Sequence, residues 1–354
     1  MTGSEIIKTL LILILTTGLV FATRFSRFYN ADAIRFTESH VVLLNERQNT
    51  DALIGTLEEM GAEFNEDELR WAAGTLGWST FLPGRYDFHE GAPYQEFLSR
   101  MALGMQDPMR VTILPGSDPY RFSGLMGQRF RADSTEFLEV FRDSAELALE
   151  HNLRGDELFA RMLPDTYDFY WTSDAVTVIS RILREFNNRV TEGMAAEISR
   201  SPLPLNEVVT LASITELEAR YSDEKARISG LYLNRLETGM LLQADPTVLH
   251  SLGERRRLLF EDYRVEHPYN TYLHPGLPPG PITNPDLASI RSVLNPEQHD
   301  YLYMVATPDG YHKFSRTFSE HRQASEEWRR WIQEQYRIRD EGLEQQTGET
   351  AVGG

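Results

Sequence analysis

Two glutamates in one apolar segment are the strongest candidates for acid–base chemistry in this chain. Glu216 and Glu218 lie in residues 206–220, where most other side chains are apolar or small. Asn206 is expected to cap this segment as a helix, and the helix is expected to be buried on most sides. A carboxyl group in such surroundings is either paired with a cation or holds its proton unusually well. A firmly held proton is what a general acid needs.

A structural role is the competing interpretation of these acids. Composition alone favours a buried glutamate that forms an ion pair with an arginine such as Arg220 or Arg235, because structural ion pairs are common. Glu216 shares its side of the helix with small residues, among them Ala212 and Ser213, which allow a ligand or a backbone to approach closely.

A second group of polar side chains lies further along the chain, in and near a stretch rich in proline and glycine. Residues 268–281 must form a rigid loop, and this loop carries Tyr269, Asn270 and Tyr272. Aromatic rings and amides together are typical of sugar-binding sites, although a loop anchored by its tyrosines explains them equally well. Gln243 and Asp245 precede the loop, and Asp245 is also expected to be the N-cap of a short helix.

The composition excludes several classes of function. The 354 residues are enough for two or three domains, and 53 acidic residues against 35 basic ones argue against nucleic acid as a partner. Cysteine is absent, so no disulfide, thiolate chemistry or cysteine-ligated metal is expected. The histidines of the third region show no metal-ligand spacing, and no metal or cofactor is expected.

The amino terminus predicts export. Residues 9–22 are almost entirely apolar, with Lys8 before them and Arg24 and Arg27 after them. This length fits a short membrane span, and residues 20–22 also fit a signal-peptidase site. The basic residues on both sides leave the orientation open.

The rest of the chain predicts an α+β protein in several parts. Residues 1–27 are the expected membrane anchor, and residues 28–109 form a strand–helix–helix–strand unit that is similar to LysM modules, which bind N-acetylglucosamine-containing glycans. Residues 110–200 repeat this order, and both units close on the pattern L-P-x-x-Y-D-F, which favours an internal duplication. Residues 201–338 form the expected catalytic domain, and residues 339–354 are the expected disordered tail.

Local signals also predict individual helices in these parts. One helix begins at Asn65, one spans residues 134–149, one is capped by Asn284–Pro285, and one runs from Ser319 to about Arg337.

An ordered series of short motifs in the third region carries a family resemblance. In chain order they are A-S-I-T-E-L-E (residues 212–218), N-R-L (234–236), M-L-L-Q-A-D-P-T-V (240–248), Y-N-T-Y (269–272), G-L-P-P-G-P-I (276–282), N-P (284–285) and H-K-F-S (312–315). The chain resembles the YceG-like, MltG-type endolytic murein transglycosylases over nearly its whole length. An ordered series of this kind is far more specific than any one of its motifs.

The resemblance implies a function and a site. It implies cleavage of the MurNAc–GlcNAc β-1,4 bond of nascent peptidoglycan strands, with 1,6-anhydroMurNAc ends as products. The implied catalytic residue is Glu216, and the residues implied to bind the glycan are Gln243, Asp245, Tyr269, Asn270, Tyr272 and Ser315. The implied location is the cytoplasmic or inner membrane, with a single span and the catalytic domain outside, and cell-wall synthases are candidate partners.

One essential acid is enough for this reaction, because the C6 hydroxyl of muramic acid serves as the internal nucleophile. Two competing functions remain open: a muramidase that hydrolyses the same bond, for which Glu218 or Asp245 would be the second carboxylate, and a non-catalytic glycan-binding scaffold anchored in the membrane. The sequence predicts that Glu216→Gln abolishes cleavage and that Glu218→Gln leaves much of it.

Overall fold

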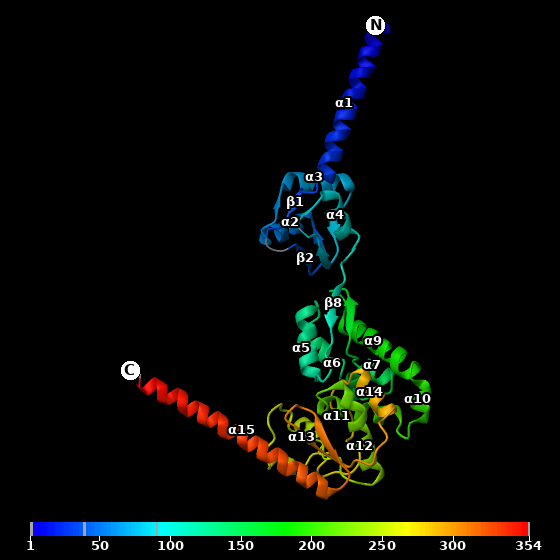
Figure 1. Cartoon of the computed structure of the whole chain (residues 1–354). Helices are drawn as coiled ribbons and strands as arrows, with labels where there is room; N and C mark the ends of the chain where they lie inside the picture. The colour runs from blue at the N-terminus through cyan, green and yellow to red at the C-terminus, as the bar shows by residue number, and fades with distance from the viewer. Residues whose placement is uncertain (1–2, 38–39, 90, 353–354) are drawn as a thin grey trace. The chain divides into compact units, whose positions relative to one another are not determined.

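The structure is a computed structural model that describes residues 3–37, 40–89 and 91–352, with side chains through residue 338. Helices and strands are mixed, which confirms the predicted α+β class (Figure 1). The chain forms two compact units. Unit 1 comprises Met1–Val111, Met126–Asp133 and Tyr167–Asp174, and unit 2 comprises Thr112–Leu125, Ser134–Thr166 and Ala175–Gly354.

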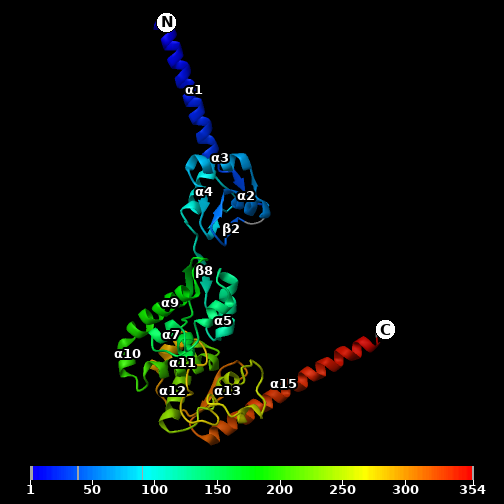
Figure 2. The same ribbon diagram turned by 180° about the vertical axis from the view of Figure 1, so that it is seen from behind.

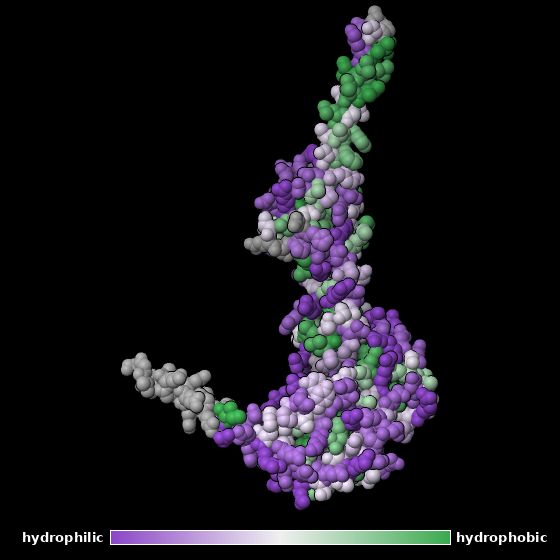
Figure 3. Space-filling model, in the orientation of Figure 1, coloured by the Kyte–Doolittle hydropathy of each residue, from purple (hydrophilic) through white to green (hydrophobic). Residues whose placement is uncertain are grey.

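Helix α1 (Gly3–Tyr29) carries the apolar amino-terminal segment. Within residues 4–29, an 18-residue window has a mean hydropathy of 2.2 and none of it is buried, and Figure 3 shows the surface of this helix as mainly hydrophobic. The helix fits a single-pass membrane anchor by length and composition, which are criteria that a signal sequence also meets. Its last turn packs on the remainder of unit 1, where Arg27 lies 3.0 Å from Glu68 and 4.4 Å above the Trp71 ring.

Unit 1 contains the strand–helix–helix–strand order that the sequence predicts. Strand β2 pairs antiparallel with β6, and Asn49 and Asn65 cap the two helices between them through their side chains. The two Asn caps satisfy backbone N–H groups that a helix start leaves free. The likeness to a LysM module stays a prediction. The elements are β1 (Ile34–Arg35), β2 (Val41–Leu44), β3 (Gln48–Asn49), α2 (Thr50–Glu59), β4 (Glu63–Phe64), α3 (Glu66–Leu76), β5 (Thr80–Phe81), β6 (Gly84–Asp87), β7 (Gly91–Ala92) and α4 (Tyr94–Ala102).

The stretch predicted to be a second copy also begins and ends with paired strands. Strand β8 (Met109–Thr112) pairs with β9 (Thr166–Phe169). The single helix predicted from Ser134 to Leu149 is instead two short helices. The elements between the strands are α5 (Pro119–Arg129), α6 (Ser134–Glu139), α7 (Glu146–Glu150) and α8 (Gly155–Ala160). Residues 110–200 are divided between the two units, and the duplication stays a prediction.

The remainder of unit 2 surrounds one apolar core to which α11, α12 and α14 all contribute. These three helices contact one another and lie together in Figure 1, and Figure 2 shows α11 and α12 together from behind. The elements are α9 (Ala175–Phe186), a π-helical turn η1 (Asn187–Glu192), α10 (Ala195–Arg200), α11 (Leu205–Glu218), η2 (Ser222–Glu224), α12 (Lys225–Glu237), α13 (Asp245–Leu252), η3 (Asp262–Arg264), α14 (Leu287–Leu294), β10 (Tyr303–Ala306), β11 (His312–Ser315) and α15 (Phe318–Val352).

Three helix boundaries differ from the sequence expectations. The residue before α11 is Pro204, and the side chain of Asn206 instead donates to Glu157 and accepts from Arg161. The cap of α14 is Asp286, whose carboxylate accepts from the Ser289 N–H, in place of the predicted Asn284–Pro285. Helix α15 continues to Val352, past the predicted end near Arg337, because its polar sequence has no proline to stop it.

Candidate active site

Helix α11 crosses the core of unit 2 and carries both glutamates in its last turn. Residues 208–215 are all buried, and the helix contacts α12, α13 and α14. A helix enclosed on all sides has no stripe of residues facing solvent. The polar groups at its carboxyl end must therefore find partners inside the domain or face a cavity.

Glu216 belongs to an ion-pair network. Its Oε2 atom lies 3.0 Å from Nζ of Lys225, and it accepts hydrogen bonds from the Asp286 N–H at 3.0 Å and the Ser289 hydroxyl at 2.6 Å. Lys225 Nζ also lies 2.9 Å from Asp286 Oδ1. The side chains of Glu216 and Lys225 are 10% and 7% exposed. These are the surroundings of a paired structural carboxylate, and they differ from the apolar surroundings that the sequence predicts.

Glu218 lies where burial favours the protonated form of the carboxyl group. Burial raises the pKa of the Glu218 carboxyl to about 8, the charge of Asp245 adds to this rise, and Arg235 opposes it. A carboxyl group of this kind keeps its proton at neutral pH and can donate it to a substrate.

Asp245 is the second carboxyl of the cluster. Its helix α13 is preceded by Ala244 as N-cap, so the Asp245 side chain does not cap the helix as predicted. It accepts a hydrogen bond from the Tyr272 hydroxyl at 2.6 Å, and Tyr263 lies 3.4 Å from its other oxygen. Burial, together with the charge of Asp245, raises the pKa of both tyrosines, which keeps their hydroxyls protonated as donors.

Helix α12 adds two groups for which the sequence indicates no part in catalysis. Tyr232 is fully buried, and within the described part of the chain its hydroxyl has no hydrogen-bond partner. Burial and the neighbouring Glu218 raise the pKa of Tyr232 well above its usual value. Arg235 is fixed by hydrogen bonds to the carbonyls of Leu302 at 2.6 Å and Leu242 at 2.5 Å. Perturbed titratable groups gathered in this way are typical of functional sites.

A cavity of 870 Å³ adjoins the segments that carry the two carboxyls. Leu217, which precedes Glu218, and Pro246, which follows Asp245, both line it. Leu249 and Ile282 add apolar surface, and Arg255 adds a positive charge. This volume is within the range of ligand-binding sites.

Gln243, just before α13, has a strained backbone conformation and is hydrogen-bonded to the proline-rich loop. Gln243 is exposed and has a φ of 49°, in a region that residues other than glycine rarely adopt. Its N–H donates to the carbonyl of Thr271 at 3.1 Å, and the Thr271 hydroxyl accepts from the Ala244 N–H at 3.0 Å. These bonds hold Tyr272 beside Asp245.

The other predicted glycan-binding residues have contacts within unit 2. Asn270 is fully buried and donates to the carbonyls of Tyr263 and Val265, so it holds the loop. The Tyr269 hydroxyl donates to Asp156 at 2.8 Å. Ser315 is 3% exposed and lies in the ladder between β10 and β11. The structure therefore brings Asp245 and Tyr272 to Glu218, and it gives Asn270, Tyr269 and Ser315 positions that support the fold.

The chain is similar to known proteins both in sequence and in structure. The model of the YceG-like family matches residues 42–327. An endolytic murein transglycosylase of Bacillus subtilis (strain 168) is 25% identical over 295 residues, which are 79% of this chain and 82% of that protein. The enzyme of the same name from Streptococcus pneumoniae serotype 2 is 30% identical over 151 residues, which are 41% of this chain and 27% of that protein. The crystal structure of a YceG-like protein from Listeria monocytogenes has a TM-score of 0.56 and 25% identity, and the match covers 80% of this chain and 97% of that one.

Proposed function

Because the chain belongs to the YceG-like family and its relatives are endolytic murein transglycosylases, we propose that it is a lytic transglycosylase of peptidoglycan. Its substrate is the glycan strand, and it cleaves the MurNAc–GlcNAc β-1,4 bond to leave 1,6-anhydroMurNAc ends. The general acid is Glu218 rather than Glu216. The observation that carries this proposal is the raised pKa of Glu218 in a cluster with Asp245.

The reaction needs one group that first gives and then takes a proton. Protonated Glu218 donates its proton to the glycosidic oxygen as the bond from C1 of the muramic acid breaks, and the GlcNAc hydroxyl leaves. The Glu218 carboxylate then takes the proton of the C6 hydroxyl, whose oxygen bonds to C1 and closes the anhydro ring. The Asp245 carboxylate, held by Tyr272, stabilises the positive charge that develops on the sugar ring.

The products test this proposal. Purified full-length protein in detergent is incubated with peptidoglycan, and the fragments are identified by mass spectrometry. We expect anhydromuramic ends, which are lighter by one water than reducing ends. Fragments with only reducing muramic ends would contradict a transglycosylase, and intact peptidoglycan would contradict an enzyme of this class.

A muramidase is the second candidate, and the presence of a second carboxyl, Asp245, close enough to act on the charge of Glu218 favours it over a non-catalytic glycan-binding scaffold. Hydrolysis of a glycosidic bond normally uses two carboxyls, one as acid and one as base or nucleophile. Both oxygens of Asp245 face tyrosine hydroxyls, which occupy the positions from which a base would take a proton from water. The same digestion separates the two candidates, because hydrolysis leaves reducing ends.

The proposed location follows from the substrate and the amino-terminal helix. Helix α1 anchors the chain in the membrane, and the remainder lies on the outer face, where peptidoglycan is found. The proposed protein partners are the synthases that polymerise the glycan strand, since a nascent strand leaves these enzymes at the membrane surface.

A further inference from the structure

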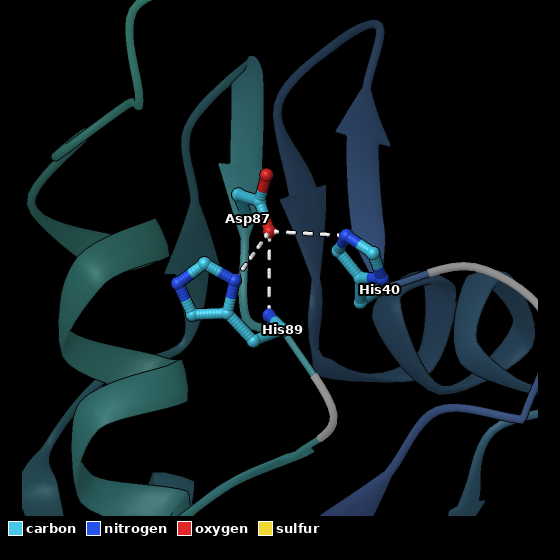
Figure 4. Close-up of side chains that lie close together, drawn as sticks. All are labelled: His40, Asp87 and His89. Carbon is cyan, nitrogen blue, oxygen red and sulfur yellow. Dashed lines mark hydrogen bonds and ion pairs between the residues drawn. The ribbon is translucent and has the colours of Figure 1, made fainter.

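A cluster of two histidines and one aspartate lies in unit 1, in residues outside the cluster around Glu218. His40 Nε2 lies 3.6 Å from Asp87 Oδ1, and His89 Nδ1 lies 3.7 Å from the same oxygen (Figure 4). All three ligand atoms lie within 4.8 Å of one another. A tetrahedral zinc ion with bonds of 2.0–2.1 Å spaces its ligand atoms about 3.3 Å apart. Small movements of the two side chains are enough to reach this spacing.

The backbone brings these residues together from distant parts of the sequence. Strands β2 and β6 pair Val41 with Asp87, and the Phe88 N–H donates to the His40 carbonyl at 3.0 Å. His40 is therefore held next to the end of β6. His40 is far from Asp87 and His89 in the sequence, so the spacing of these residues gives no metal-binding motif.

The conformation of His89 turns its ring back toward the aspartate. Its φ is 54°, in the left-handed region, and its N–H donates to Asp87 Oδ1 at 3.3 Å. Residues other than glycine adopt this region at a cost, so the surrounding bonds must hold it.

Asp87 is held in the orientation that a metal ligand needs. Arg85 donates to its Oδ2 at 3.1 Å, which leaves Oδ1 for the ion between the two imidazoles. Such bonds to the second oxygen commonly orient carboxylate ligands.

The cluster has an open side. His40 and His89 are 51% and 89% exposed, and Asp87 and His89 also line a cavity of 610 Å³ in unit 1. Two imidazoles and one carboxylate are ligands suited to zinc, copper, nickel and cobalt, and the open side leaves room for water as a further ligand. We propose that His40, Asp87 and His89 bind one divalent transition-metal ion.

Titration calorimetry tests this site on the full-length chain in detergent, prepared without a histidine tag. Zinc chloride is the probe, and cobalt(II) absorption reports the coordination geometry. We expect one ion per chain. His40→Ala and His89→Ala should each weaken binding at least about tenfold, because losing even an outer-shell partner of a metal typically costs that much. Zinc should also raise the Tm of the wild type more than that of either variant.

His151→Ala is the matched control. His151 is exposed and lies in unit 2, so its loss should leave zinc binding unchanged. Both histidine variants remove exposed side chains, and their Tm without metal reports whether they fold. The proposal is overturned if the wild type takes up no zinc, or if folded His40→Ala and His89→Ala bind zinc as the control does.

Discussion

At the scale of single residues, two glutamates separated by one position have opposite surroundings. Glu216 accepts hydrogen bonds from Ser289 and the Asp286 backbone and is paired with Lys225. The pKa of Glu218 is raised by burial and by Asp245. Successive helical residues point in directions about 100° apart, so residues two positions apart face different neighbours. The catalytic assignment to Glu218 rests on this difference.

The pH dependence of cleavage follows from the raised pKa. The acid must be protonated, so kcat/KM should fall as the pH rises through about 8. The negative charge of Asp245 raises this pKa, and Asp245→Asn should therefore lower it and move the alkaline limb to lower pH. Asp300→Asn, at an exposed aspartate, is the control and should leave the limb in place.

The titration of Glu218 can also be followed by NMR of carbon-labelled glutamate, which reports the pKa even if Asp245→Asn cleaves too slowly to assay. An unchanged or higher pKa of Glu218 in the folded variant would show that Asp245 does not act on it.

The sequence indicated helix α11 and its two acids as candidates, but it could not show the contacts that distinguish Glu216 from Glu218. The partner of Glu216 is Lys225, nine positions along the chain but on another helix, and not the Arg220 or Arg235 that the sequence indicated. The pKa of Glu218 depends on Asp245 and Arg235, which approach it only after α12 and α13 have packed. No periodicity within α11 reports such contacts.

At the scale of elements, Lys225 joins α12 to α11 and to the start of α14. Lys225→Met would leave Glu216 and Asp286 near each other without their cation. Breaking a buried ion pair on one side costs about 3–5 kcal/mol, so the variant should unfold at a clearly lower temperature. Scanning calorimetry measures the change.

Lys313→Met is the control for this variant. Lys313 pairs with Glu327 at the surface with its side chain 52% exposed, and such a pair contributes about 1 kcal/mol or less. Equal unfolding temperatures for the two variants would show that the network does not hold the helices together.

Short-range signals located the elements well and their ends less well. Asn65 caps α3 as predicted, because its side chain reaches the N–H of Glu68. Asn206 has the same side chain but lies inside α11, where it bonds with Glu157 and Arg161. Asp245 lies one residue past the cap of α13. Each shift arises from a tertiary partner that competes for the side chain.

At the scale of the whole molecule, the length and apolar composition of α1 lead us to expect that the protein is retained in the membrane. Its apolar side chains are exposed along its length, and Arg27 and Phe28 pack on Trp71 of unit 1 immediately after the apolar stretch. Full-length protein should stay with membranes through an alkaline carbonate wash, and deletion of residues 1–29 should release it. A mature chain that begins at residue 23 would instead identify a cleaved signal sequence.

The most direct test of the account compares Glu218→Gln with Glu216→Gln in the peptidoglycan digestion. Each variant is first shown to fold by circular dichroism and calorimetry, so that a loss of the Lys225 network is measured apart from chemistry. We expect Glu218→Gln to form anhydromuramic ends at least about a hundredfold more slowly, which is the usual contribution of a general acid. We expect folded Glu216→Gln to keep measurable cleavage. Full activity in Glu218→Gln, together with loss in a folded Glu216→Gln, would contradict the account and return the acid to Glu216.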